Sequence, residues 1–175
     1  MIKISTRCQI DFISKWKNKE GKEFEERRRV YRHSDGYPDG VIPDLKEFLK
    51  WNFSRNEDLE YITANFIYWS KRNFEDTFLK PKWNDGKTII WNSKEVIEDN
   101  NSVIKLGFGI CDINKFHGDI EWFYEVINNM GKIEIKIYKC HGWDVKSKEE
   151  MSLIKTIKVP LEKKSISAVI SQPSI

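Results

Sequence analysis

Apolar and polar residues alternate along the first twelve positions of the chain, and a period of two is typical of a β-strand with one buried face. The even positions carry the apolar series and the odd positions carry the polar one. This pattern predicts a strand over residues 2–12. Its polar face is expected to carry Arg7, Gln9 and Asp11.

A polar stretch with a glycine at 17–22 follows and indicates a hairpin loop that leads into a second strand. The second strand is predicted from about Phe24 to His33. Alternation places Tyr31 and His33 on the same face of that strand. If the two strands pair antiparallel, this face is the one that carries Arg7.

The spacing of apolar residues then changes from two to the helical repeat. Pro43 suits the first turn of a helix, which predicts a first helix over 43–52. Ser54 and Glu57 match a capping box, so a second helix is expected to begin there and to run to about residue 73. The apolar stripe of the second helix consists of Leu59, Ile62, Phe66 and Trp69.

The next part of the chain contains several glycines. Residues 80–101 are predicted to form a turn, a strand at the short apolar run 88–91, and a polar loop. In the predicted strand at 106–110, Gly107 and Gly109 leave one face without side chains. Such a face permits close approach of another backbone or of a ligand, and a bulge or tight packing under a helix are equally common reasons for it.

Residues 120–126 and 133–137 alternate on either side of a turn and predict a β-hairpin, and residues 153–159 predict a last strand. The order strand, strand, helix, helix and then several strands predicts an α+β fold. We expect a mostly antiparallel sheet with two helices packed on one face. We also expect a single domain over residues 1–164 and a flexible tail over 165–175.

Composition narrows the classes of partner. The 175 residues carry 30 basic and 27 acidic side chains of mixed order, which is unlike the concentrated basic surface of a protein that binds duplex nucleic acid. No stretch approaches the roughly 18–20 apolar residues of a membrane span. Cys8, Cys111 and Cys140 are far apart and do not suggest a disulfide framework. We therefore expect a cytoplasmic protein with neither a membrane nor a duplex as its partner.

The sequence lacks the common catalytic signatures, namely a phosphate loop, a dinucleotide loop, a nucleophile elbow and a His-Glu-x-x-His pair. The spacings from Cys111 to His117 and from Cys140 to His141 do not form the paired ligands of a structural zinc site, so no metal and no cofactor are expected. Cys140 and His141 are the one local cysteine–histidine pair. Adjacent strand residues point to opposite faces, so this pair does not indicate covalent catalysis.

The junction between the second strand and the first helix reads YRHSDGYPDG. A bend between the two elements is a sufficient explanation for Gly36, Pro38 and Gly40. His33 and Asp35 are not required by a bend. Asp35 can accept a hydrogen bond from one imidazole nitrogen and leave the other nitrogen for a ligand, so both a structural and a functional role for this pair stay open.

Three stretches combine into a recognisable pattern: Ser5-Thr-Arg7, the core from Tyr31 to Gly40, and, more weakly, residues 119–138. Together they resemble a family of small proteins frequent in phages and other mobile elements, whose members typically begin Met-Ser-Thr-Arg and carry Tyr-x-His-x-Asp-Gly-Tyr-Pro-x-Gly. The chain departs from the family at Ser34, where an aromatic residue is common. It also departs at 79–101, which does not align.

The family has no established general activity, so the resemblance implies a context. Phage accessory proteins of this size often counter host defence, and one strategy is to sequester the nucleotide signals that defence systems make. We therefore expect a protein that binds and sequesters a nucleotide-derived small molecule. Arginines would contact phosphates, aromatic side chains would stack on a base, and the histidine with its aspartate would bond to ribose or base edges. The candidate ligand-binding residues are Arg7, Tyr31, Arg32, His33, Asp35, Tyr37, Trp122 and Tyr124.

Two alternatives remain. The first is a phosphodiesterase-like enzyme with His33 as general acid or base beside Asp35. Binding is the preferred hypothesis because the motif contains a single histidine and no second catalytic group. The second alternative is an inhibitor whose aromatic-rich surface binds a host defence protein. An antiparallel edge strand or the tail can support a homo-oligomer.

Overall fold

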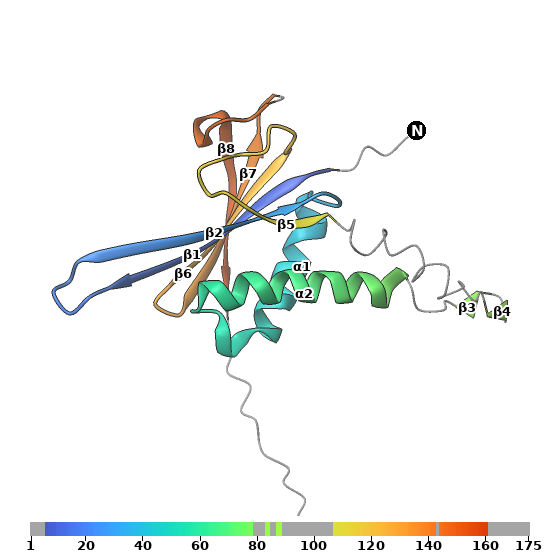
Figure 1. The fold of residues 1–175 in the computed structure, drawn as a ribbon, viewed down its shortest axis with the longest axis horizontal. Coiled ribbons are helices and arrows are strands. Elements are labelled where there is room, and N and C mark those ends of the chain that lie inside the picture. The colour runs from blue at the N-terminus through green and yellow to red at the C-terminus, as the bar shows by residue number, and fades with distance from the viewer. Residues whose placement is uncertain (1–5, 79–82, 85–86, 89–106, 143, 161–175) are drawn as a thin grey trace, which may run out of the picture.

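The computed structural model describes residues 6–78, 83–84, 87–88, 107–142 and 144–160. It contains a six-stranded sheet with the strand order β5-β2-β1-β6-β7-β8 and two long helices (Figure 1). Strands β1 and β6 are parallel, and the other neighbours in this sheet are antiparallel. The predicted α+β class and the order ββαα followed by strands are confirmed. The strands of the sheet are β1 (Cys8–Lys17), β2 (Glu23–Arg32), β5 (Phe108–Cys111), β6 (Trp122–Asn129), β7 (Lys132–Cys140) and β8 (Met151–Val159).

The predicted N-terminal hairpin is present, although β1 extends further along the chain than expected. The register pairs Cys8 with Arg32 and Lys17 with Glu23. In the connecting loop the Asn18 side chain accepts hydrogen bonds from the backbone N–H groups of Glu20 and Lys22. Backbone hydrogen bonds from Asn18 N–H to the Lys22 carbonyl and from Gly21 N–H to the Asn18 carbonyl close the same turn. The first residues of the predicted strand, 1–5, lie outside the described part.

Both helix starts were predicted wrongly. Helix α1 (Pro38–Trp51) begins at Pro38, because a proline supplies the fixed φ of the first helical turn and the residue before it is extended. The capping box does not form, since Ser54 lies in a short 3₁₀ turn, η1 (Phe53–Arg55). Helix α2 (Leu59–Phe78) begins instead after Asp58, whose carboxylate accepts the backbone N–H of Tyr61 at 3.3 Å.

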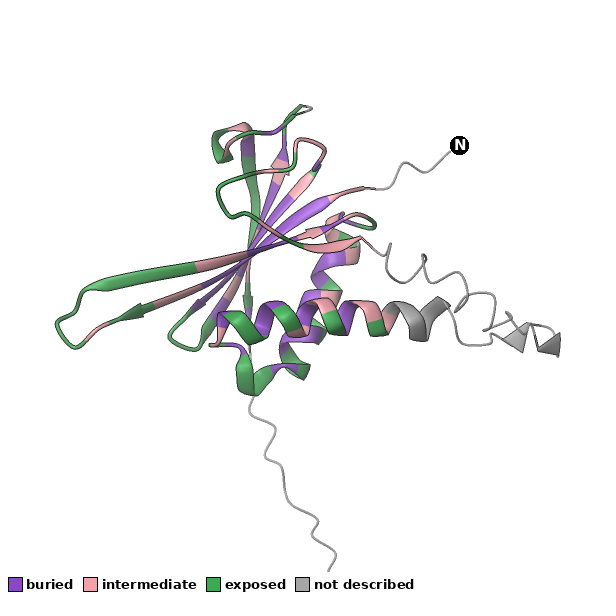
Figure 2. Ribbon diagram, viewed as in Figure 1, coloured by how far each residue is buried: buried purple, intermediate pink, exposed green. Residues whose placement is uncertain are grey.

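The two helices cover one face of the sheet and bury its apolar side chains there (Figure 2). The ring of Phe12 on β1 lies 6.2 Å from Phe48 of α1 and 5.3 Å from Phe66 of α2, all three in edge-to-face geometry. Each such ring contributes roughly 1.5–3 kcal/mol by burial. The even positions of β1 thus face the helices, as the alternation predicted.

The other face of β1 is polar as predicted, but the prediction of a single buried face is wrong. Gln9 and Asp11 are fully buried there. The connection between β5 and β6, residues 112–121, lies over them: the N–H of His117 donates to Gln9, and the Lys115 carbonyl accepts from Arg29, the partner of Asp11. The described part of the connection between β7 and β8, residues 141–142 and 144–150, contributes Val145 to the same side. A second apolar cluster fills the space beneath these connections, and its members are Ile120, Phe123, Tyr138, Cys140, Val145 and Met151.

A buried ion pair makes this second face possible. Arg29 of β2 donates to Asp11 of β1 through Nε at 2.6 Å and through Nη2 at 2.8 Å. The same guanidinium donates to the carbonyl oxygen of Lys115 at 2.9 Å and stacks on the ring of Phe116 at 4.1 Å. Arg29 therefore both neutralises Asp11 and fixes the first covering connection to the sheet.

The later strands follow the predicted pattern. The hairpin of β6 and β7 is confirmed, and β8 begins at Met151, shortly before the predicted start. Two short strands, β3 (Trp83–Asn84) and β4 (Lys87–Thr88), form a separate pair, whereas the rest of the predicted strand at 88–91 and the tail at 165–175 lie outside the described residues. Among the described helices, none combines the length and the apolar character needed to cross a membrane.

Candidate functional site

Five polar and aromatic side chains meet on the second face of the sheet, and we call them the Tyr31 cluster: Arg7, Tyr31, His33, His117 and Asp119. Arg7 Nη1 lies 3.0 Å from Asp119 Oδ2. The Tyr31 hydroxyl donates to the same Asp119 oxygen at 3.4 Å and lies 3.2 Å from His33 Nδ1. The ring of His117 stacks on the ring of Tyr31, with centroids 4.3 Å apart. The predicted convergence of Tyr31 and His33 with Arg7 is thus present, through Asp119.

The Tyr31 hydroxyl lies between two partners, His33 and Asp119. It carries one proton, and the Asp119 carboxylate and His33 Nδ1 both lie within reach of it. Burial and the neighbouring Asp119 carboxylate raise the pKa of Tyr31 to about 12, so the hydroxyl stays protonated and keeps its role as donor.

Glycine brings His33 into position. The backbone N–H of His33 donates to the carbonyl oxygen of Gly107 at 2.7 Å. A Cβ atom on Gly107 would lie 2.0 Å from the Cβ of His33, which is a steric clash. Of the readings left open for the bare face of this strand, close approach of another segment is therefore the correct one at Gly107.

The bend after β2 is also held by close packing. A Cβ on Gly36 would lie 2.8 Å from the backbone of Arg7 and Cys8. The N–H of Gly36 donates to the Thr6 carbonyl at 2.9 Å, and its own carbonyl accepts the hydroxyl of Tyr124 at 2.8 Å. The structural explanation of Gly36 is sufficient, and contact with the neighbouring backbone is its physical basis.

The connection 112–121 supplies His117 and Asp119. Its backbone is fixed to the sheet at three places: the Lys115 carbonyl on Arg29, the N–H of His117 on Gln9 Oε1 at 3.1 Å, and the N–H of Glu121 on the Arg7 carbonyl at 3.0 Å. These contacts place the side chains of His117 and Asp119 against β1 and β2.

Sequence reasoning missed His117 and Asp119 as site residues. They lie in a loop, where no periodicity fixes the direction of a side chain. The parallel pairing of β1 with β6, which brings this loop beside Arg7, is equally invisible in the pattern. The one available signal was the weak family resemblance, which starts at Asp119.

Three candidates lie on the helix-covered face and not in the Tyr31 cluster. Arg32 is buried and donates to Asp44 at 2.7 Å and to the Ser34 carbonyl at 2.8 Å. Tyr124 is fully buried with its hydroxyl on Gly36, and burial raises its pKa. Trp122 packs against the helical core and lies under the Lys139 ammonium at 4.6 Å. The suggested stacking of a base on Trp122 or Tyr124 therefore cannot occur beside His33.

Asp35 and Tyr37 shape the bend. Asp35 is exposed and has a φ of 53°, a left-handed conformation that aspartate tolerates better than most residues. Tyr37 is the extended residue that precedes α1, and its ring covers the position of Gly40. The bend between β2 and α1 thus explains the conformations of both residues.

Unsatisfied polar atoms gather at one place. Among the described residues, the buried side-chain nitrogen and oxygen atoms without a hydrogen-bond partner are Arg7 Nε, Gln9 Nε2 and Asp119 Oδ1. All three belong to the Tyr31 cluster or lie directly beneath it. An unpaired buried polar atom costs roughly 1–3 kcal/mol, so three in one place lower the local stability of this region.

The two cysteine–histidine pairs, Cys140 with His141 and Cys111 with His117, have different geometries. Cys140 is buried, and His141 is exposed with Nε2 2.7 Å from the Ser152 hydroxyl, so the adjacent pair is accidental as predicted. Cys111 Sγ, however, lies 3.6 Å from His117 Nε2. In the described part of the chain, no three histidine, cysteine or carboxylate side chains gather in a way that would hold a metal ion.

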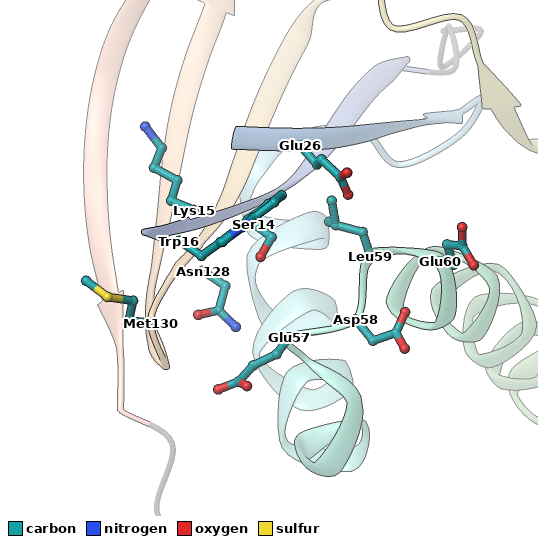
Figure 3. Close-up of a pocket in the computed structure, with 10 residues that line it drawn as sticks. All are labelled: Ser14, Lys15, Trp16, Glu26, Glu57, Asp58, Leu59, Glu60, Asn128 and Met130. Carbon is teal, nitrogen blue, oxygen red and sulfur yellow. The ribbon is translucent and has the colours of Figure 1, made fainter. Parts of the chain in front are cut away.

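A cleft of about 650 Å³ lies elsewhere, between the far end of the β1–β2 hairpin, the start of α2 and the β6–β7 turn (Figure 3). Four carboxylates line it: Glu26, Glu57, Asp58 and Glu60. Its one lysine, Lys15, is already paired with Glu25 at 2.9 Å. The charge of this cleft disfavours an anionic ligand such as a nucleotide, so we place the candidate site at the Tyr31 cluster.

Comparisons of the chain with family models, with curated proteins and with solved structures find no match.

Proposed function

We propose that the Tyr31 cluster binds a small nucleotide-type ligand and that the protein acts by holding this ligand. The observation that carries the proposal is the unpaired atoms of the Arg7–Asp119 ion pair. Arg7 Nε is a donor without an acceptor, and Asp119 Oδ1 is an acceptor without a donor. A phosphorylated ribose offers the complementary set, since phosphate oxygens accept from a guanidinium and a ribose hydroxyl donates to a carboxylate.

Part of the cluster is accessible to a ligand. The side chains of Arg7 and Asp119 are 32% and 40% exposed, although their unpaired atoms are buried, so a ligand that reaches these atoms must shift the two side chains. The rings of His33 and His117 border the same place, since both contact Tyr31. A flat imidazole stacked on Tyr31 gives a base or a sugar a surface to lie against.

The resemblance to small proteins of phages and mobile elements supports sequestration as the purpose of binding. Sequestration requires a ligand held without conversion. The protein would then remove a nucleotide signal from a host defence system, and its cytoplasmic location and a homo-oligomeric state belong to the same proposal.

A second candidate function, a phosphodiesterase, gains support from His117. The motif contains a single histidine, which favoured binding. The structure places a second imidazole against Tyr31, while the Tyr31 hydroxyl contacts the first. Two histidines beside an arginine are a workable acid–base set for cleavage of a phosphodiester.

One experiment separates these candidates. The purified protein is incubated with a panel of cyclic and ADP-ribose-derived nucleotides, freed of unbound ligand and heat-denatured, and the released material is identified by chromatography and mass. Intact ligand supports sequestration, and a converted product supports the enzyme. If no nucleotide is retained or converted, both fail, and binding of a host protein through the acidic cleft and the exposed Trp16–Phe24 pair becomes the preferred hypothesis.

A further inference from the structure

The three cysteines have different surroundings. Cys8 and Cys140 are buried in the two apolar clusters, where burial raises the pKa of their thiols to about 12 and about 11. Burial also shields both thiols from dissolved reagents. Cys111 differs: it lies on β5, the edge strand of the sheet, and is only partly buried. A dissolved reagent can reach Cys111 alone among the three.

A base lies beside the Cys111 thiol. The distance from Cys111 Sγ to His117 Nε2 is 3.6 Å, within reach for sulfur. His117 is held on both sides of this contact: its ring stacks on Tyr31, and its backbone N–H donates to Gln9 Oε1. The imidazole is therefore oriented toward the sulfur by contacts that do not involve the thiol itself.

The buried side-chain amide of Gln9 is a second feature of the surroundings of Cys111, separate from His117. Its side chain is fully buried, yet Nε2 has no hydrogen-bond partner of normal geometry among the described residues. Burial raises the pKa of the Cys111 thiol, and the Gln9 side chain opposes this rise ahead of the Arg29 guanidinium. The Gln9 amide thus lies beside the sulfur without a normal hydrogen bond in the resting state, and its N–H is placed to donate more strongly when the sulfur becomes anionic.

We propose that Cys111 is a thiol-modification site that exchanges with low-molecular-weight disulfides, with His117 as its base and Gln9 Nε2 as the donor to the developing thiolate. His117 Nε2 accepts the thiol proton as Cys111 Sγ attacks one sulfur of the disulfide. A new S–S bond forms to Cys111, the original S–S bond breaks, and the leaving thiolate recovers the proton from His117. One disulfide replaces another, so no separate oxidant is needed.

This site rests on the contacts around Cys111 and needs no bound nucleotide, although His117 belongs both to it and to the Tyr31 cluster. An adduct on Cys111 must displace the imidazole from its present contact with sulfur, so the redox state of small thiols would be felt at the cluster.

The test uses the full chain with oxidised glutathione near neutral pH, with acid quenching, intact-mass measurement over time and peptide mapping. The expected result is one glutathione per chain, on Cys111. His117→Gln should slow the reaction by roughly a hundredfold, the low end of what a positioned base contributes. The matched control, His141→Gln, changes the histidine beside Cys140 and should leave the rate unchanged.

Gln9→Met keeps the shape of the side chain without the amide donor and should also slow the reaction, which gives a second reading if His117→Gln fails to fold by circular dichroism. Modification on Cys8 or Cys140, absence of an adduct, or equal rates for the wild type and the variants would overturn the proposal.

Discussion

At the scale of single residues, the close packing of Gly107 against His33 explains why a glycine stands at position 107. Gly107 has no room for a side chain because His33 occupies that space, whereas nothing lies within 4 Å of a Cβ on Gly109. The two glycines stand two residues apart in the same segment and face the same bare side of it. They therefore form a natural pair of test and control.

Gly107→Ala should lower the free energy of unfolding by roughly 1–3 kcal/mol, because the new methyl group overlaps His33. Gly109→Ala should change it by about 0.5 kcal/mol or less. Urea unfolding followed by tryptophan fluorescence measures both. Equal effects of the two substitutions would mean that His33 does not pack against Gly107.

The raised pKa of Tyr31 predicts how the stability of the protein depends on pH. Its pKa is raised from 10.0 to about 12 in the folded protein, so the folded state binds its proton more tightly than the unfolded state. The stabilisation is complete below pH 10 and is lost as the pH rises toward 12. The stability difference between the wild type and Tyr31→Phe should therefore shrink across this window.

The measurement is urea unfolding of both proteins at several pH values below and within that window. Tyr61→Phe serves as the control, because Tyr61 is half exposed on α2, and its difference from the wild type should stay constant. A difference for Tyr31→Phe that is independent of pH would show that the hydroxyl is not buried beside Asp119.

At the scale of elements, the connection 112–121 depends on one buried ion pair. Arg29 is 1% exposed and Asp11 is fully buried. Removing one partner of such a pair leaves an uncompensated buried charge, which is worse than replacing both partners with apolar residues. Arg29 additionally holds the Lys115 carbonyl, so its loss also frees the loop that carries His117 and Asp119.

Arg29→Met should therefore lower the free energy of unfolding by about 3–5 kcal/mol, and the double substitution Asp11→Leu with Arg29→Met should regain most of it. Arg27→Met is the control: Arg27 also contacts Asp11, at 3.4 Å, but is one-third exposed, and its loss should cost about 1 kcal/mol or less. If the double variant is no more stable than Arg29→Met, the charge of Asp11 is not the source of the cost.

Whole-molecule features show where sequence reasoning succeeds and where it ends. Alternation correctly placed Tyr31 with Arg7 and the hairpin of β6 and β7, because a period of two fixes the face of every strand residue. It failed at Gln9 and Asp11, since a polar strand face reads the same whether water or a loop covers it. Tertiary contacts such as Arg29 on Lys115 join residues far apart in the chain, and no local pattern contains them.

Helix boundaries failed for a related reason. Pro38 and Pro43 both satisfy the local rule for a first helical turn, and Ser54 and Asp58 both satisfy the rule for a cap. The packing of Gly36 against Arg7 and Cys8 selects Pro38, because it fixes where the chain leaves the sheet. The choice between two acceptable local signals is thus made by the assembled fold.

The central claim is that the Tyr31 cluster, and not the acidic cleft, binds a nucleotide. The most direct test is calorimetric titration of a nucleotide retained from the panel against the wild type, Arg7→Gln and Lys15→Gln. Both variants lose one positive charge, the first in the cluster and the second at the cleft. A charge-assisted hydrogen bond contributes about 1.5–3 kcal/mol, so Arg7→Gln should weaken binding by roughly ten- to a hundredfold.

Lys15→Gln should bind the nucleotide as the wild type does. Unchanged affinity of Arg7→Gln, or a loss of affinity confined to Lys15→Gln, would contradict the assignment of the site.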